Sequence, residues 1–138
     1  QIVIGAFVSG MDAGQIYNSW PLMGSNYFPD DNKYLSLFKF SAFSDPSLVQ
    51  FMHRNLAYII LIFYMIIMFK IYSNKLINLY FSINLLGLLL IIQIILGIFT
   101  LLYGAQIYLA SMHQLSSIFL VSASVYFLYL NSNQQLSS

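Results

Sequence analysis

Residues 48–69, LVQFMHRNLAYIILIFYMIIMF, are the stretch that decides the fold. A helix needs about 20 predominantly apolar residues to cross the hydrocarbon core of a bilayer, and this run is long enough. It carries His53 and Arg54 close to its start. Polar and ionisable groups are costly inside a membrane and usually face the protein interior, so this pair is a candidate functional site.

The composition of the whole chain agrees with a membrane protein. Of 138 residues, 59% are hydrophobic and 7% are charged, against roughly 25% charged residues in soluble domains. We therefore predict an all-α integral membrane protein. The net charge of +1 gives no reason to expect nucleic acid as a partner. Because cysteine is absent, a metal would have to be bound by His, Asp, or neutral oxygen and thioether groups.

The chain is predicted to be one membrane domain, residues 1–138. Its predicted segments are a partial transmembrane helix (1–13), an outer loop (14–47), a transmembrane helix (48–69), an inner loop (70–78), two further transmembrane helices (79–103 and 107–130) and a polar tail (131–138). The first segment is apolar but too short for a full span. We expect it to be the second half of a helix, either because the chain is a fragment or because an upstream piece is removed or separately encoded.

The predicted loops set the orientation in the membrane. Lys70 and Lys75 place the loop 70–78 inside by the positive-inside rule, and the acidic loop 14–47 then lies outside. That outer loop holds all three prolines, the single Trp and many aromatic residues. An aromatic belt at the headgroup level and a lid over the polar edge of a cofactor are both open interpretations of it.

Two histidines are predicted to lie at one depth. His53 and His113 are nearly equally far from the starts of the spans 48–69 and 107–130. At a rise of about 1.5 Å per residue, both then lie about 7 to 9 Å below the outer end. Two neutral imidazoles on facing helices could be the axial ligands of one haem iron. Plain helix packing, and proton or ion handling, remain open alternatives at this point.

The neighbours of the histidines give weaker signals. Arg54 points about 100° away from His53 around the helix. Spacing alone favours an arginine that reaches the outer interface or lipid phosphate, and pairing with a haem propionate is the alternative. Small residues near the two histidines could leave room for a flat macrocycle; these are Ala57, Ala110, Ser116 and Ser117.

An internal repeat supports the pairing of the histidines. QIVIGAFV at Gln1 is similar to QIILGIFT at Gln93, and FMHRNLAYIIL at Phe51 is similar to SMHQLSSIFLV at Ser111. The chain therefore resembles two copies of a helix pair, which pseudo-symmetry would place with their histidines facing. We predict a four-transmembrane-helix bundle with a haem between its second and fourth helices.

Several elements resemble the C-terminal half of haem A synthase, of the alphaproteobacterial and mitochondrial type. These are GAFVSGMDAGQIYNSWPLMG with Pro29 and Asp30 after it, LVQFMHR, QIILGIFTLLYG and the segment with ASMHQ. The likeness covers essentially the whole chain in order, and its D-A-G-x-x-Y-N-x-W-P-x-M element is not a generic membrane pattern. The resemblance implies half of a pseudo-symmetric eight-helix fold, with this sequence as helices five to eight.

The resemblance also implies a chemistry. The family oxidises the C8 methyl of haem O to the formyl group of haem A for cytochrome oxidase. Its C-terminal half holds haem b through one histidine of an HR element and one of an HQ element, which match His53 and His113 here. The substrate haem is handled by the N-terminal half, whose histidines and glutamate have no counterpart in this sequence. The chain is thus expected to be the non-catalytic haem b half of the enzyme.

The resemblance implies a location and partners as well. We expect the mitochondrial inner membrane or a bacterial plasma membrane, with His53 and His113 towards the outer side. The expected partners are membrane lipid, an N-terminal half that is fused or separate, or a second copy of the chain, with haem O and haem O synthase as further candidates. Two departures from the family are Ser44 and Asp45, where relatives commonly carry Glu-Asn, and the absence of the outer-loop cysteine pairs of some bacterial branches.

Two other functions stay open on the sequence. A stand-alone b-type electron-transfer subunit with two histidine ligands would bind haem reversibly and without an N-terminal half. A purely structural membrane protein would bind no haem.

Overall fold

The computed structural model describes residues 1–136, with side chains described up to residue 133, and these residues contain α-helices, short 3-10 helices and no strand. The α-helices are α1 (Ile2–Gly10), α2 (Pro46–Ser73), α3 (Tyr80–Leu102) and α4 (Ile107–Leu136). The 3-10 helices are η1 (Ala13–Gln15), η2 (Tyr34–Phe38), η3 (Phe40–Ser44) and η4 (Ile77–Leu79). Three helical stretches, one of them η4 with α3, are long and apolar enough to cross a membrane. The predicted all-α class is thus confirmed.

The N-terminus of helix α2 is capped by a side chain. The Asp45 side chain accepts a hydrogen bond from the backbone N–H of Leu48 at 3.0 Å, and Pro46 occupies the first turn. An aspartate cap satisfies an N–H that the helix itself leaves unpaired, and proline needs no such partner there. The helix then runs to Ser73, four residues beyond the predicted end at residue 69.

A tight left-handed turn joins α3 to α4. Gly104 and Ala105 have φ of +67° and +55°, and the glycine adopts this region without a steric cost. Helix α4 continues to Leu136 through most of the segment 131–138 that the sequence predicted as a polar tail. The helix extends beyond the prediction because this segment is polar but contains neither proline nor glycine to stop it. Residues 137–138 of that tail lie outside the described residues.

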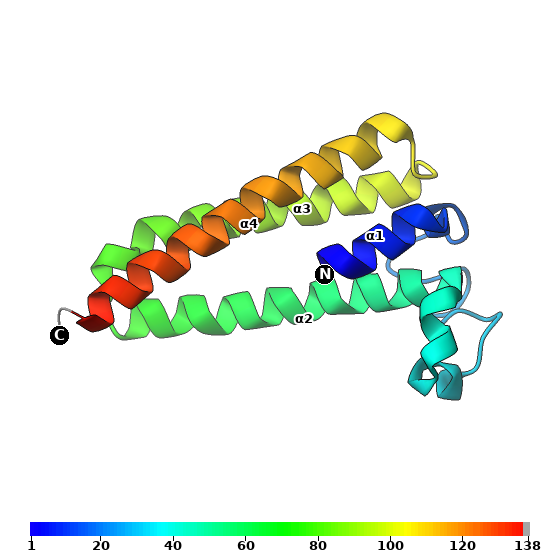
Figure 1. Ribbon diagram of the computed structural model, residues 1–138, viewed down its shortest axis with the longest axis horizontal. Helices are drawn as coiled ribbons and strands as arrows, with labels where there is room; N and C mark the ends of the chain where they lie inside the picture. The colour runs from blue at the N-terminus through cyan, green and yellow to red at the C-terminus, as the bar shows by residue number, and fades with distance from the viewer. Residues whose placement is uncertain (137–138) are drawn as a thin grey trace.

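The helices form two pairs. Figure 1 shows α3 and α4 side by side along their lengths, and α1 beside the first half of α2. The pairs converge at the end where the chain terminates, around a buried cluster of Ile71, Leu79, Ile83 and Phe127. At the opposite end α2 and α4 diverge, and α1 occupies the region beside them. The site described below lies in this open half of the molecule.

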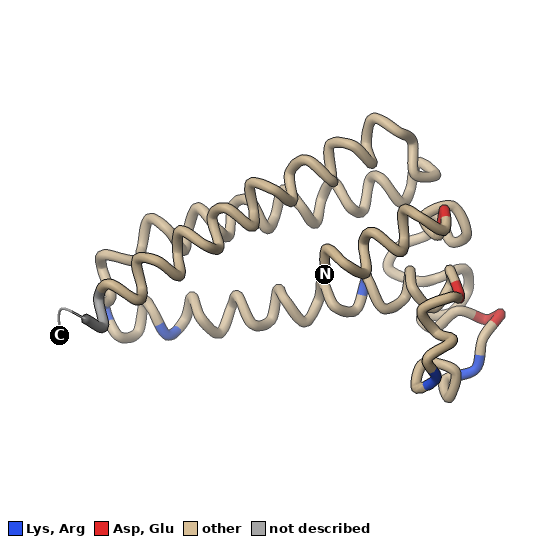
Figure 2. The backbone as a smooth tube through the Cα atoms, in the orientation of Figure 1, with Lys and Arg blue, Asp and Glu red and all other residues tan. Residues whose placement is uncertain are grey.

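The outer loop is folded onto the start of α2. Phe28, Ala42 and Leu48 form a buried cluster against which Phe51 and Met52 pack. The four aspartates lie at this end of the molecule, and Lys70 and Lys75 lie at the other end of α2 (Figure 2). Several large apolar side chains of the loop are exposed, namely Tyr34, Leu35, Phe38 and Phe40.

Candidate functional site

The structure brings the two predicted histidines together across the open half of the bundle. His53 on α2 and His113 on α4 have ring centroids 6.4 Å apart, and their ring planes make an angle of 77°. Both side chains are partly buried. Residues that are 60 positions apart in the sequence therefore face each other at one level of the fold.

His53 is held by two residues of α1. The side-chain amide nitrogen of Gln1 lies 3.4 Å from the ring Nε2 of His53 and donates to the backbone oxygen of the same residue at 3.2 Å. Gly5 follows one helical turn later on the same face. A Cβ atom added to Gly5 would come within 3.2 Å of the ring Cε1, so the imidazole lies directly against the backbone of α1.

His113 has the same surroundings, supplied by α3. The side-chain amide nitrogen of Gln93 lies 3.4 Å from the ring Nε2 of His113 and donates to its backbone oxygen at 3.1 Å. Gly97 is one turn further on, and a Cβ atom there would come within 2.9 Å of the ring Cε1. The repeat seen in the sequence thus corresponds to a repeated contact in space, with Gln, Gly and His in equivalent places.

One contact distinguishes the two copies. The hydroxyl of Ser116 lies within hydrogen-bond distance of two acceptors, the side-chain oxygen of Gln93 and the backbone oxygen of His113 at 2.9 Å, which share its single proton. The corresponding position on α2, three residues after His53, is Leu56, which has no hydroxyl. The sequence interpretation took Ser116 as a small residue that leaves room for a macrocycle. In the structure its hydroxyl is instead bonded to α3.

Arg54 holds the outer loop. Its guanidinium donates to the backbone oxygens of Tyr17 at 2.9 Å, Ser19 at 2.9 Å and Leu22 at 3.2 Å. One side chain thereby donates to three carbonyl groups of an irregular segment, and two of these also accept from another side chain, Tyr17 from Gln50 and Leu22 from Ser19. The Arg54 Nε is buried and has no hydrogen-bond partner among the described residues. A contact between Arg54 and a haem propionate stays a prediction.

A polar cluster stabilises the loop outside the spanning helices. The Tyr17 hydroxyl donates to Asp30 at 2.5 Å, and the Ser47 hydroxyl donates to Asp31 at 2.6 Å. Partial burial, the hydrogen bond to Asp30 and the nearby negative charges raise the pKa of Tyr17 to about 12. Partial burial alone would raise the pKa of Asp31, but the hydrogen bonds that this carboxylate accepts, from Ser47 first, outweigh it and lower that pKa.

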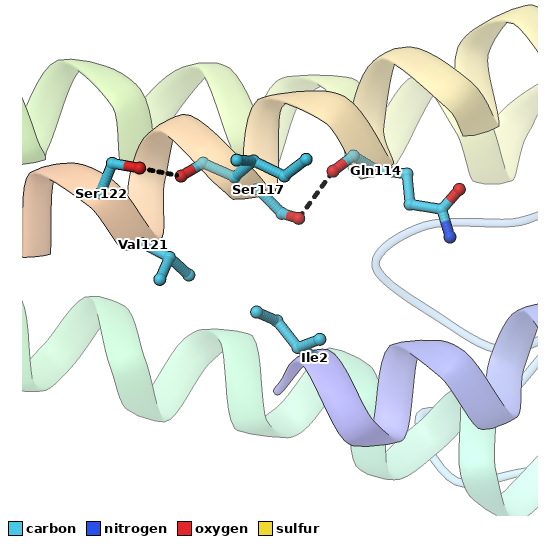
Figure 3. A pocket seen from close by; sticks show the side chains of 6 residues that line it. Ile2, Gln114, Ser117, Val121 and Ser122 are labelled. Atoms are coloured by element: carbon cyan, nitrogen blue, oxygen red, sulfur yellow. Dashed lines mark hydrogen bonds between the residues drawn. The ribbon is translucent and has the colours of Figure 1, made fainter.

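Two open hollows lie along α4. One of about 390 Å³ is lined by Ser111, Gln114, Leu115 and Ile118. The other, of about 470 Å³, is lined by Ile2, Gln114, Ser117, Ile118, Val121 and Ser122. In Figure 3, Ile2 of α1 and Val121 of α4 project into it from opposite sides. The second hollow therefore lies between α1 and α4, and neither histidine is among the residues that line the two hollows.

The donor set fits a haem iron better than a bare metal ion. Among the described residues there is no group of three or more His, Cys, Asp or Glu side chains that could hold a metal ion. A haem iron needs only two axial ligands from the protein. With metal–imidazole bonds of roughly 2 Å, two imidazoles on opposite sides of one iron would have ring centres about 6 Å apart, close to the observed 6.4 Å. The Nδ1 atoms of both rings are buried without a hydrogen-bond partner among the described residues.

The sequence interpretation missed the residues that surround the rings. The repeat alone singles out Gln1, Gly5 and Gln93, and it assigns them no contact with the rings. The spacing Q-x-x-x-G, present in both copies, is the signal that could have found them, because residues four apart share one helix face. Paired with a histidine in each copy, it marks residues that line the site.

The chain is similar to known membrane enzymes. A family model described as cytochrome oxidase assembly protein matches residues 1–125. The chain is 46% identical over 137 residues to haem A synthase of Pelagibacter ubique, covering 96% of this chain and 39% of that protein. It is 44% identical over 129 residues to haem A synthase of Rickettsia bellii, covering 91% of this chain and 37% of that protein. No solved structure matches the chain.

The match is one of partial length. The chain spans less than two fifths of these relatives and corresponds to their C-terminal part. Together with the three helices that are long and apolar enough to cross a membrane, the relationship identifies an integral membrane protein. With its family model covering most of its length, the chain belongs to the haem A synthase family of cytochrome oxidase assembly proteins.

Proposed function

We propose that this chain is the haem b-binding half of a haem A synthase, the enzyme that oxidises the C8 methyl of haem O to the formyl group of haem A. The observation that carries the proposal is the pair His53 and His113, whose rings face each other at a separation suited to one iron. Family membership supports a role in haem A biosynthesis for cytochrome oxidase assembly.

In this proposal each residue of the site has one role. His53 and His113 are the axial ligands, one from each helix pair. Haem bound there would supply a one-electron redox centre. Arg54 keeps the outer loop closed over the start of α2 through three carbonyl groups. Its buried Nε has no hydrogen-bond partner among the described residues, and its N–H suits a propionate oxygen.

Catalysis on haem O is assigned to a second half. The chain contains no glutamate, and its two histidines are both used by the proposed haem b site. We therefore propose that it combines with an N-terminal half, fused or separate, to give a pseudo-symmetric eight-helix enzyme, with self-association as the alternative arrangement. Haem O and haem O synthase would bind to that assembly.

The proposed location follows from charge. Lys70 and Lys75 lie in a short loop without aspartate, whereas Lys33 and Lys39 lie in a long loop with three aspartates, and short basic loops favour the inner side of a membrane. The histidine pair then lies towards the outer side of a bacterial plasma membrane or of the mitochondrial inner membrane.

Co-expression tests the assignment of the halves. The chain should bind haem b alone, and it should give conversion of haem O to haem A only together with the N-terminal half of a close relative such as the Pelagibacter ubique protein. Haem A formed by the chain alone would contradict a non-catalytic role. Reversible haem binding with no conversion in any combination would favour the stand-alone electron-transfer subunit instead.

A further inference from the structure

We infer that Gln1 and Gln93 are positioning residues, which set the orientation of the imidazoles of His53 and His113 towards a common iron. The inference rests on the proposed function, since it takes these two rings as the ligands. It assigns a role to two glutamines, one at the start of α1 and one on α3, the helices that carry no histidine.

Each glutamine contacts its histidine twice. The amide nitrogen donates to the backbone oxygen of the histidine, at 3.2 Å for Gln1 and 3.1 Å for Gln93, and lies 3.4 Å from the ring Nε2 in both cases. The first contact ties the helix that carries the histidine to its neighbour at that residue. The second places a polar group beside the ring nitrogen. Inside a membrane there is no water to replace either contact.

Such contacts matter because an axial ligand must point at the iron. A histidine side chain turns about two torsion angles, and a working metal site requires its ligands within about 10–20° of the right direction. Groups that touch the ligand but not the metal usually supply that constraint. The glutamines are the side chains that contact the ring nitrogens of both histidines.

Glycine completes the arrangement in each copy. Gly5 and Gly97 lie four residues after Gln1 and Gln93, on the same helix face. A Cβ atom at either position would lie within 3.2 Å or 2.9 Å of the ring Cε1. The ring is thus confined between a glutamine amide and a bare stretch of backbone.

The duplication is an independent argument against accidental packing. The same three residue types make the same contacts on two different pairs of helices. One copy carries an additional constraint, because the Ser116 hydroxyl donates to the side-chain oxygen of Gln93. His113 is therefore the more firmly oriented ring.

Substitution of Gln93 by Met tests the inference, because Met has a similar length and no amide. The matched control is Gln106→Met, the same change at an exposed residue just before α4 that lines neither hollow. The purified protein is titrated with haem, and its low-spin electron paramagnetic resonance signal is recorded. We expect Gln93→Met to bind haem roughly 10–100-fold more weakly and to shift the g-values, which depend on ring orientation. Gln106→Met should match the wild type in both.

The outcomes separate the two proposals. A wild-type protein without a low-spin signal would overturn the haem assignment itself. A wild-type signal together with unchanged affinity and g-values in Gln93→Met would overturn only the positioning role. Since loss of Gln93 could unfold α3, Gln1→Met provides a second test on the other helix pair. It should shift the g-values through the His53 ring, and an unchanged signal there would also contradict the inference.

Discussion

The two helix pairs make the same contacts to a histidine but are joined by different loops. In both, a Gln and a Gly of the first helix hold a His of the second. They differ in the residue after the histidine and in the connection between the helices. Arg54 on α2 donates hydrogen bonds to the long loop that precedes α2. Gln114 on α4 follows the tight turn between α3 and α4. The contacts to the ring are thus repeated in both pairs, while only the first pair has a residue beside the histidine that binds the preceding loop.

The largest expected loss of stability comes from replacing Arg54, which donates hydrogen bonds to the long loop before α2. Arg54→Leu removes three hydrogen bonds to the loop. The Tyr17 and Leu22 oxygens keep a second donor, Gln50 and Ser19 respectively, and the Ser19 oxygen loses the side chain that donates to it. We expect the free energy of unfolding to fall by roughly 2–4 kcal/mol, because hydrogen bonds to charged groups contribute about 1.5–3 kcal/mol each and are not additive. Denaturation in detergent and limited proteolysis of residues 14–47 measure it.

The matched substitution on the other pair is Gln114→Leu, which should leave the turn and the stability nearly unchanged. Arg54→Lys should recover only part of the loss, because one ammonium group cannot reproduce the fork of a guanidinium. Equal losses in Arg54→Leu and Gln114→Leu would refute the division of roles between the two helix pairs.

Alanine at the two glycines compares the two ring sites directly. At Gly97 the new Cβ atom would approach the ring of His113 to 2.9 Å, and at Gly5 it would approach His53 to 3.2 Å. Overpacking of this kind costs about 1–3 kcal/mol. We expect Gly97→Ala to lose more stability and more bound haem than Gly5→Ala, measured by thermal unfolding and by haem content after purification. The reverse order would show that the first helix pair is the tighter one.

A smaller effect is expected from the hydroxyl present in one copy only. Ser116→Ala removes the donor to Gln93 and should cost about 1 kcal/mol, the usual contribution of one hydrogen bond. Ser117→Ala is the matched control, since its hydroxyl donates to the backbone oxygen of Gln114 within the same helix. If both variants unfold at the same denaturant concentration, Ser116 does not stabilise the position of the His113 ring.

The smallest effect is a pH dependence confined to the outer loop of the first pair. Since the pKa of Tyr17 is raised from 10.0 to about 12 in the folded loop, its contribution is fully present below pH 10 and is lost between about pH 10 and 12. The contribution of Asp31, whose pKa is lowered, is lost in strong acid as the pH falls through its folded pKa. Fluorescence of Trp20, the single tryptophan, follows both changes, and Tyr17→Phe should abolish the alkaline one.

Hydropathy and spacing predicted the helices and the meeting of the histidines. Three apolar runs of the right length gave the spanning helices, and equal depth on two of them placed His53 and His113 together. Both inferences need only the rise per residue of a helix. The end of α4 was predicted too early, because polarity was taken as the end of the helix where nothing in the chain stops it.

The partners of polar side chains could not be predicted in the same way. Arg54 binds carbonyl groups whose positions depend on the path of an irregular loop, and periodicity carries no information about that path. Ser116 is small, but its hydroxyl matters more than its size once Gln93 is beside it. The hydrogen-bond partner of a polar side chain can be identified only when the position of the neighbouring helix is known.

The most direct test of the account is the optical spectrum of the protein with bound haem. The account predicts a six-coordinate low-spin b-type spectrum for the wild type, and loss of that spectrum in both His53→Ala and His113→Ala, because each ring supplies one axial ligand. A spectrum that stays unchanged after either substitution would contradict it.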